Sequence, residues 1–307
     1  MLGLPQVTVR TAGVTRTATT LLSRRPGAAY AETELIDPSP EILPSEADAF
    51  VHAVEEAVLD ARGAAAAADT CCRPGLAIMG TCPGGATDDL YVRCVLAATH
   101  AMARGEDKED AAELVTLLDG YRGVAGVLAS GLVSVLKINY KELCLLLAAD
   151  REHGAAPEPA TLEVWALQQS ADGIPLSRLL GRLKVGALAV TDGGRPAFLA
   201  VRLADNRVAA YLFDLPAGVA VVNAIGSGDA TAAAMLASLL GAPELSAQEA
   251  QDYEAAIVDG LPIKAVVAAM VAGLATATAA VQTAHPDDFD PGSVAHWAKE
   301  ITPRRLL

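Results

Sequence analysis

The sequence predicts an α/β fold: a mostly parallel central sheet between helices, with a small separate β sheet at the N-terminus. Short unbroken apolar runs, which are typical of buried parallel strands, alternate with helical segments from Leu76 onward. The strand candidates near the N-terminus have no helix between them, so they predict the small sheet. A chain of 307 residues is long enough for one large α/β domain or two small ones.

The composition excludes two broad classes of protein. The chain is 52% hydrophobic with a mean hydropathy of +0.33, so it has ample apolar surface to offset the entropy of ordering and is not a disordered chain. It contains 37 Asp and Glu against 23 Lys and Arg, a net charge of −14. General nucleic-acid binding needs clustered cations, and we therefore expect no direct nucleic-acid partner.

The five cysteines show no spacing typical of metal ligands and predict reduced thiols in an intracellular compartment. Residues 1–31 contain four arginines and no acidic residue, a composition that also suits an organelle transit peptide. We favour extended strands over 6–10 and 16–21, because these stretches do not form an amphipathic helix. Cytoplasm and organelle both stay open as locations.

One segment approaches the length of a membrane span. Residues 265–281 are apolar for 17 positions apart from two threonines. The segment is rich in Ala, Gly and Thr rather than Leu, Ile or Phe, and it is bounded by Lys264 and Gln282. We interpret it as a buried core helix and expect no membrane span.

In the N-terminal half, each expected element follows from a local pattern. A helix begins near Ser45 with an acidic first turn and places Phe50, Val51, Val54 and Val58 on one face. An alanine-rich stretch after it predicts a linker. The expected elements are strands at 6–10, 16–21 and 33–36, a helix at 45–62, a linker at 63–68, a strand at 76–79, a loop at 80–85 and a helix at 88–104.

The C-terminal half continues the alternation of strands and helices. An acidic stretch at 244–259 predicts a surface insertion, and a polar segment at 151–159 separates two groups of helices. The expected strands are 114–118, 132–136, 186–190, 197–201, 209–213 and 219–223. The expected helices are 121–129, 142–150, those within 161–183, 230–240, 265–281 and 293–301.

The strongest chemical signal is the segment 223–231, where a predicted strand, a glycine turn and a small-residue helix follow one another. The backbone amides of such a turn converge on one point, where the helix dipole adds partial positive charge. Gly226, Ser227 and Gly228 thus predict an anion hole. Asp229 suits a base that takes a proton from a hydroxyl attacking a phosphoryl group. A plain helix cap is the other interpretation.

This segment resembles the second signature of the PfkB/ribokinase family of sugar kinases, usually written (N/D)T(V/T)GAGD. The asparagine at its start is closer to the phosphosugar branch, which includes 1-phosphofructokinase and tagatose-6-phosphate kinase. Other segments resemble family motifs in the family's order: KINYKEL at 137–143, LAIMGTCPGGA at 76–86, Asp119-Gly120, VTDG at 190–193, GVTR at 13–16 and TEL at 33–35.

The resemblance implies a role for each matched residue. Asp229 would be the catalytic base, and Asn139 with Glu142 would organise Mg²⁺ through water, which fits a cation that needs few direct protein ligands. ATP would be bound by Lys137, Thr191, Gly193 and Asn223, and Arg16 would bind the phosphate already on the sugar. The ordinary alternatives are a turn and helix-end charge at 139–142, a simple turn at 191–193 and a surface arginine at 16.

The resemblance also implies a ribokinase-like three-layer αβα fold, with lid strands in residues 1–40 and a nucleotide-binding core in 41–307. Family members begin with strands and helices ahead of the lid, so we expect about the first quarter of the family's length to be absent from this chain. Its loss would leave part of the sheet uncovered. We therefore expect a homo-oligomer, or a subunit of a larger complex that covers this sheet.

Two functions from different classes follow. The first is an ATP- and Mg²⁺-dependent kinase that phosphorylates a sugar or sugar phosphate, supported by Asp229 and the glycine turn. The second is a catalytically inactive, kinase-derived subunit retained for its fold and surfaces. An inactive subunit has no requirement for Asp229, which favours the enzyme, although a family fold alone does not establish activity.

Overall fold

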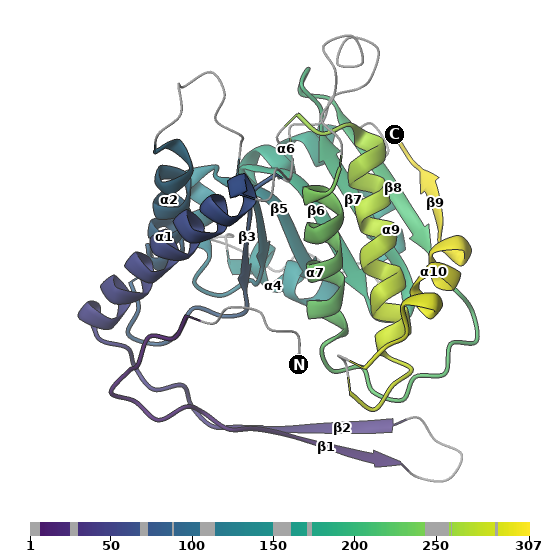
Figure 1. Ribbon diagram of the computed structural model, residues 1–307. Coiled ribbons are helices and arrows are strands. Elements are labelled where there is room, and N and C mark those ends of the chain that lie inside the picture. Colours follow the sequence, from purple (N-terminus) through teal and green to yellow (C-terminus); the bar gives the residue numbers. More distant parts are fainter. Residues whose placement is uncertain are drawn as a thin grey trace.

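The computed structural model describes residues 7–24, 30–67, 73–87, 89–104, 114–149, 161–170, 174–242, 258, 260–285 and 288–307. Its centre is a seven-stranded sheet in the order β3-β4-β5-β6-β7-β8-β9 (Figure 1). Strands β3 to β6 are parallel, and β7, β8 and β9 continue the sheet antiparallel. The strands are β3 (Gly75–Met79), β4 (Val115–Asp119), β5 (Val133–Asn139), β6 (Val185–Asp192), β7 (Arg195–Arg202), β8 (Val208–Asp214) and β9 (Thr302–Arg305).

Helices cover both faces of this sheet, which confirms the expected three-layer α/β fold (Figure 1). Alternate residues of each strand point to opposite faces, so Leu118 and Leu136 face one layer while Leu117 and Val135 face the other. The first layer contains α1 (Pro44–Ala67), α2 (Leu90–Ala103), α3 (Ala125–Ser130), α4 (Tyr140–Ala149), α5 (Leu162–Gln169) and α6 (Ile174–Leu183). The second contains α7 (Ser227–Leu240), α9 (Ile263–Ala280) and α10 (Pro291–Glu300).

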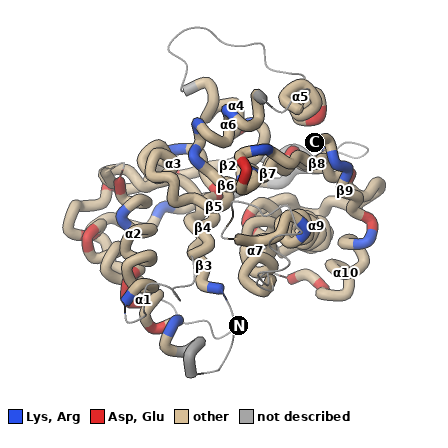
Figure 2. Tube along the Cα trace, turned by 90° about the horizontal axis from the view of Figure 1, so that it is seen from above, with Lys and Arg blue, Asp and Glu red and all other residues tan. Residues whose placement is uncertain are grey.

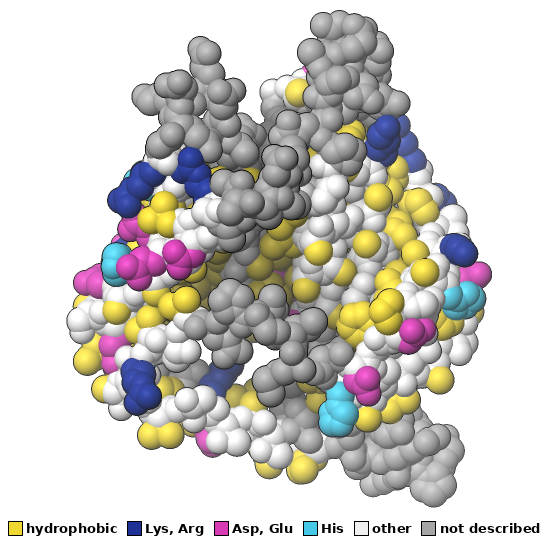
Figure 3. All heavy atoms as spheres, viewed as in Figure 1, with side chains coloured by type: hydrophobic (Ala, Val, Ile, Leu, Met, Phe, Trp, Pro, Cys, Tyr) yellow, Lys and Arg dark blue, Asp and Glu magenta, His cyan; other side chains and the backbone are white. Residues whose placement is uncertain are grey.

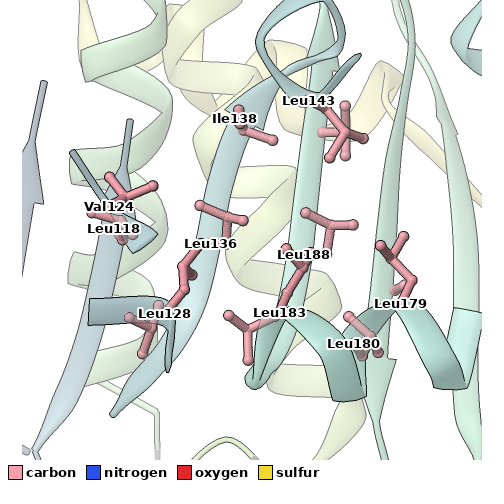
Figure 4. Packing of buried hydrophobic residues seen from close by; sticks show 14 of the residues in the cluster. Leu118, Val124, Leu128, Leu136, Ile138, Leu143, Leu179, Leu180, Leu183 and Leu188 are labelled. Carbon is pink, nitrogen blue, oxygen red and sulfur yellow. The ribbon is translucent and has the colours of Figure 1, made fainter. Parts of the chain in front are cut away.

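The first layer is held by branched aliphatic side chains. Figure 4 shows Leu136 and Ile138 of β5 and Leu188 of β6 in one cluster with Leu143 of α4 and Leu180 of α6. All five side chains are fully buried. Burying each such side chain contributes about 1.5–3 kcal/mol, so this cluster holds β5 and β6 rigidly at the centre of the sheet.

The segment expected to be a buried core helix is confirmed as α9. Among the described residues, α9 is the one helix that is long and apolar enough to span a membrane. However, 56% of it is buried within the fold. Gly273 allows its close approach to α7, because a Cβ there would lie 2.7 Å from both the Thr231 carbonyl oxygen and the Met235 Cγ. Leu274 and Met270 complete the packing against the sheet.

The small N-terminal sheet is an antiparallel hairpin of β1 (Ala18–Arg24) and β2 (Tyr30–Ile36). It extends beneath the main sheet and apart from it (Figure 1). The expected strand at 6–10 is wrong for the described residues 7–10, which are not in a strand, and the strand expected at 16–21 begins at Ala18. Thr17 and Asp37 close the base of the hairpin, with Asp37 N donating to Thr17 O at 2.9 Å.

Several other boundaries were wrong for physical reasons. The alanine-rich stretch at 63–67 continues α1 instead of forming a linker, since alanine has the highest helix propensity. Residues 219–223 form no strand; Val221 and Val222 are 50% and 40% exposed, and the sheet is extended beside β8 by the unpredicted β9 instead. The short helix expected at 121–129 begins at Ala125.

The acidic insertion expected at 244–259 lies outside the described residues, apart from the buried Val258. Elsewhere in the described chain, positive and negative residues are interspersed around the periphery, and residues other than Lys, Arg, Asp and Glu (tan) predominate along α7 and α9 (Figure 2).

Candidate functional site

A cavity of about 320 Å³ lies at the carboxyl ends of β5 and β6, between the first turn of α7 and the C-terminal half of α9. Six of the residues singled out from the sequence line it: Lys137, Asn139, Thr191, Gly193, Ser227 and Gly228. The topology brings them together because the carboxyl ends of parallel strands meet at one edge of a sheet, where ligands of open α/β folds bind.

The first turn of α7 forms one wall of the cavity. Gly226 is the N-cap in the left-handed conformation, with φ of +78°, and this tight turn directs the chain into the helix. The amides of the first helical turn have no intrahelical acceptor and carry the positive end of the helix dipole. Within the expected anion hole, Ser227 N donates to Ala224 O at 3.3 Å, so it also closes the turn.

Lys137 approaches this helix end closely. A Cβ built on Gly228 would lie 3.0 Å from the Lys137 Nζ, so any side chain at this position would displace the ammonium, by a few tenths of an ångström for a methyl group and by more for a larger group. The ammonium and the first turn of α7 therefore converge on the same side of the cavity, where they can hold an anion together.

The Lys137 ammonium is paired with a carboxylate that the sequence did not single out as a site residue. Its Nζ lies 2.7 Å from Asp119 Oδ2, and the two side chains are 4% and 13% exposed. Burial raises the pKa of Asp119, Lys137 opposes that rise, and the nearby carboxylates Glu142 and Asp229 add to it. Four charged side chains therefore lie within electrostatic reach of one another at this end of the sheet.

Asn139 and Glu142 lie at the junction of β5 and α4 and are joined by two hydrogen bonds. Asn139 Oδ1 accepts from Glu142 N at 2.9 Å, and Glu142 Oε2 accepts from Asn139 N at 3.2 Å. Only Asn139 of the pair lines the cavity. The arrangement satisfies backbone donors at the start of α4 and leaves the remaining carboxylate and amide lone pairs for a cation or water.

The turn between β6 and β7 forms a second wall. Gly193 has φ of +61°, a conformation that favours glycine, and it follows an irregularity in the β6–β7 ladder between Val190 and Asp192. Asp192 Oδ1 accepts from Arg195 Nη2 at 2.6 Å and ties the turn together. Thr191 and Gly193 therefore face the cavity from a rigid edge.

Five of the expected site residues lie outside the cavity lining: Arg16, Glu142, Asn223, Gly226 and Asp229. Asp229 is exposed in the first turn of α7 and, with Gly226, lines a shallow apolar groove along the outer side of that helix. The Asn223 side chain donates to Ala284 O at 3.0 Å and accepts from Ile225 N at 3.0 Å, so it braces the loop ahead of α7. Arg16 Nη1 donates to Ser39 Oγ at 3.1 Å beside the base of the hairpin.

The apolar wall of the cavity was not predicted from the sequence. This wall comes from the loop after β8 and from α9: Leu215, Pro216, Val219, Val221, Leu274, Ala277 and Val281. Val222 N and Asn223 N both donate to Val281 O, at 2.7 and 3.1 Å, and hold the loop against the helix. The sequence signal for this wall is the apolar run at 219–223, directly ahead of the glycine turn, whose pattern predicts a strand but whose residues Val219 and Val221 line the cavity.

No protein-family model matches the chain, and no curated protein sequence matches it either. Solved structures do. They include a possible 1-phosphofructokinase from Thermotoga maritima (14% identity over 95% of this chain and 71% of that chain, TM-score 0.60). Phosphofructokinase-2 from Escherichia coli in complex with fructose-6-phosphate matches at 15% identity over 88% of this chain and 66% of that one, with a TM-score of 0.52.

Ribokinase from Giardia lamblia is similar in the same way, at 10% identity over 92% of this chain and 72% of that chain, with a TM-score of 0.52. The chain thus spans about two thirds of the length of these structures. At such identities the likeness shows the fold, and the expected ribokinase-like fold is confirmed.

Proposed function

We propose that this chain, which has the fold of phosphofructokinases and ribokinase, is an ATP-dependent sugar-phosphate kinase. The observation that carries the proposal is the first turn of α7: Gly228 lies against the Lys137 ammonium, and the exposed carboxylate of Asp229 follows it directly. A cation, a helix N-terminus and an adjacent free base are the parts that phosphoryl transfer to a hydroxyl requires.

The cavity suits a nucleotide in both size and polarity. Its apolar wall, with Leu215, Val219 and Leu274, supplies a surface for a planar base, and its polar end contains Lys137 and Ser227. Ligand sites of this size combine apolar walls with a few polar groups that fix orientation. ATP bound with its base on the apolar wall would direct its phosphates toward Lys137 and the first turn of α7.

The residues present also fit a magnesium ion. The described residues contain no cluster of three His, Cys, Asp or Glu side chains of the kind that encloses a metal. Mg²⁺ bound with a nucleotide, however, is held by phosphates and water with one or two protein oxygens. Asn139 and Glu142 would supply those oxygens, and the bound ion would neutralise charge on the transferring phosphate.

In the proposed reaction, each of these residues has a separate role. Asp229 accepts the proton of the attacking sugar hydroxyl. Lys137 and the amides of the first turn of α7 stabilise the negative charge on the transferred phosphoryl group. Most of the reduction of the barrier comes from this positioning and charge stabilisation, because phosphoryl transfer offers little covalent chemistry to the protein.

A phosphorylated sugar is the acceptor that we propose. Arg16 lies next to the base of the β1–β2 hairpin, where its guanidinium would hold the phosphate already on the sugar. Arginine binds phosphate through several parallel donors, and its bond to Ser39 uses only one of them. Support also comes from the Escherichia coli structure, which contains fructose-6-phosphate.

A non-catalytic subunit is the second candidate, favoured by the state of one sheet edge. Strand β3 is the edge of the described sheet, and Ala77 and Met79 are exposed there, with Met79 at 39%. An open apolar edge strand is a template for pairing with another chain. In this function the chain would be retained for this surface and not for its chemistry.

A coupled ADP-release assay with Mg-ATP separates the two functions. The acceptors are tagatose 6-phosphate, fructose 6-phosphate and fructose 1-phosphate, each offered to the unaltered chain, Asp229→Asn and the control Asp205→Asn. Asp205 is exposed, pairs with Arg207 at 2.5 Å and lies on the β7–β8 turn away from the cavity lining. We expect sugar-dependent turnover that falls about 10²–10⁴-fold in Asp229→Asn alone. Turnover equal in all three chains would remove Asp229 as the base, and no turnover with any sugar would favour the subunit.

A further inference from the structure

The buried ion pair beside the cavity has its geometry set by the sheet. Asp119 and Lys137 are register partners at the carboxyl ends of the parallel strands β4 and β5. Gly80 N donates to Asp119 O at 2.7 Å, which fixes the backbone of Asp119 from the β3 side. Because both side chains come from strand ends packed in the core, their 2.7 Å contact is built into the fold.

The position of the Lys137 ammonium needs a compensating charge. It is 3.0 Å from the Cβ position of Gly228, at the positive end of the α7 dipole, and its side chain is 4% exposed. An ammonium ion buried against a helix N-terminus is repelled by the dipole and deprived of water. Asp119 is the anion in direct contact with it.

Two further carboxylates of the described residues lie near the pair. Glu142 and Asp229 are close enough to act on Asp119 electrostatically. Neither forms an ion pair with Lys137 within the described residues, whereas Asp119 does. Asp119 is thus distinguished from its neighbours by its direct contact with the Lys137 ammonium.

We propose that Asp119 is a positioning residue that holds the Lys137 ammonium against the first turn of α7, where Lys137 meets the terminal phosphates of the nucleotide. Asp119 acts through Lys137 and touches no substrate itself. The inference rests on the proposed function for the identity of the anion.

A double-mutant cycle tests this assignment. The variants are Asp119→Asn, Lys137→Met and the two together, with Asp205→Asn as the control for loss of a carboxylate. For each we would measure kcat, KM for Mg-ATP and, separately, the affinity for ATP by calorimetry. A mispositioned group costs about 10²-fold in rate, so we expect kcat to fall by about that factor in Asp119→Asn. The double variant should be no slower than Lys137→Met, since the two residues act as one unit.

Loss of one partner of a buried pair can prevent folding, because it leaves the other charge uncompensated. The apolar pair Asp119→Leu with Lys137→Met avoids this, and urea unfolding would verify that this pair and the reference variant Lys137→Met are both folded. We expect its kcat to equal that of Lys137→Met. A kcat clearly below that value, or additive losses in the cycle, would show that Asp119 has a role independent of Lys137 and would overturn the proposal.

The affinity measurement keeps this test separate from the test of the kinase itself. If no sugar supports turnover in the unaltered chain, the proposed function fails, but ATP affinity still decides the role of Asp119. Weaker ATP binding in Asp119→Asn, equal to that of Lys137→Met, supports the positioning role. Unchanged or tighter binding overturns it, because it would mean that the carboxylate only repels the anion.

Discussion

Asn139 and Glu142 each accept a hydrogen bond from the other's backbone, at 2.9 and 3.2 Å. This is the reciprocal arrangement of a capping box, with Asn139 as the cap of α4 and Glu142 three residues later. The two residues expected to organise Mg²⁺ therefore also start the helix that follows β5. A useful variant must separate the stabilising role from the metal-binding one.

Glu142→Gln and Glu142→Ala separate these two roles. A glutamine side chain can still accept the hydrogen bond from the backbone N–H of Asn139 but has no charge. Alanine loses both the hydrogen bond and the charge. We expect Glu142→Gln to leave the free energy of unfolding unchanged and Glu142→Ala to lower it by about 1 kcal/mol. Both should raise the Mg²⁺ concentration needed for half-maximal turnover about 10-fold or more. Mg²⁺ titrations that coincide with that of the unaltered chain would leave Glu142 with a capping role alone.

Gly228→Leu should abolish nucleotide binding without unfolding the chain. A side chain at this position enters the space of the Lys137 ammonium, which a Cβ would approach to 3.0 Å. Gly228→Ala, which requires a shift of only a few tenths of an ångström, should weaken binding less. Calorimetric titration with ATP measures both effects.

Gly181→Ala is the matched control for these glycine variants. Gly181 is exposed on α6, and apart from its chain neighbours and the nearby backbone of its own helix nothing lies within 4 Å of its Cβ position. Replacing a helical glycine by alanine should stabilise the protein by about 0.5–1 kcal/mol and leave ATP binding unchanged. Equal ATP affinity in Gly228→Leu and Gly181→Ala would contradict the anion site at α7.

Gly273→Ala should destabilise the packing of α9 on α7. The added Cβ would lie 2.7 Å from the Thr231 carbonyl oxygen, a backbone atom that cannot turn aside as a side chain can. Overpacking of this kind costs about 1–3 kcal/mol, and we expect the urea midpoint to fall accordingly. A midpoint at or above that of the unaltered chain would show that α9 can move away from α7 at no cost.

Alkaline pH should destabilise the fold through two buried ionisable side chains of α2, Tyr91 and Cys94. Burial is the main cause that raises the pKa of Cys94 to about 11 and that of Tyr91 to about 12. In the unfolded chain these groups ionise near 9 and 10, so the unfolded state loses its protons first and stability falls as pH rises from about 9 to 12. Thermal unfolding between pH 8 and pH 11 measures this.

The variant Cys94→Ala isolates the contribution of the thiol. It should flatten the fall in Tm between pH 9 and pH 11, where the folded and unfolded thiols differ in protonation. Parallel Tm curves for Cys94→Ala and the unaltered chain would mean that the thiol ionises equally in both states. The decrease in Tm that Cys94→Ala still shows above pH 10 is assigned to Tyr91 and other groups.

Local sequence patterns were sufficient for most elements of the fold. The apolar runs that became β3 to β8 and the glycine turn that starts α7 depend on residues that are neighbours in the chain, and their periodicity and turn chemistry are visible there. The boundary errors arose where propensity and context disagreed. The alanine stretch after Arg62 stayed helical, and the run at 219–223 became a cavity wall.

Which apolar residues are exposed depends on how the elements pack, and the local sequence does not show it. In Figure 3, apolar side chains are scattered over the face formed by α7 and α9, and a hollow separates this face from the layer with α1. The exposure of Met79 at the β3 edge depends on which strands are neighbours, and its own sequence environment is that of a buried strand.

The sequence by itself determined the α/β class and the turn at Gly226, because both follow from short-range patterns. Lys137 and Asn139, which line one cavity with Ser227, were indicated only by the resemblance of their segment to a family motif. Only the tertiary structure decided that Lys137 pairs with Asp119, that α9 and the loop after β8 form the apolar wall, and that β9 extends the sheet. These contacts join residues far apart in the chain. Packing and burial select them after the local elements have formed, so no short-range pattern records them.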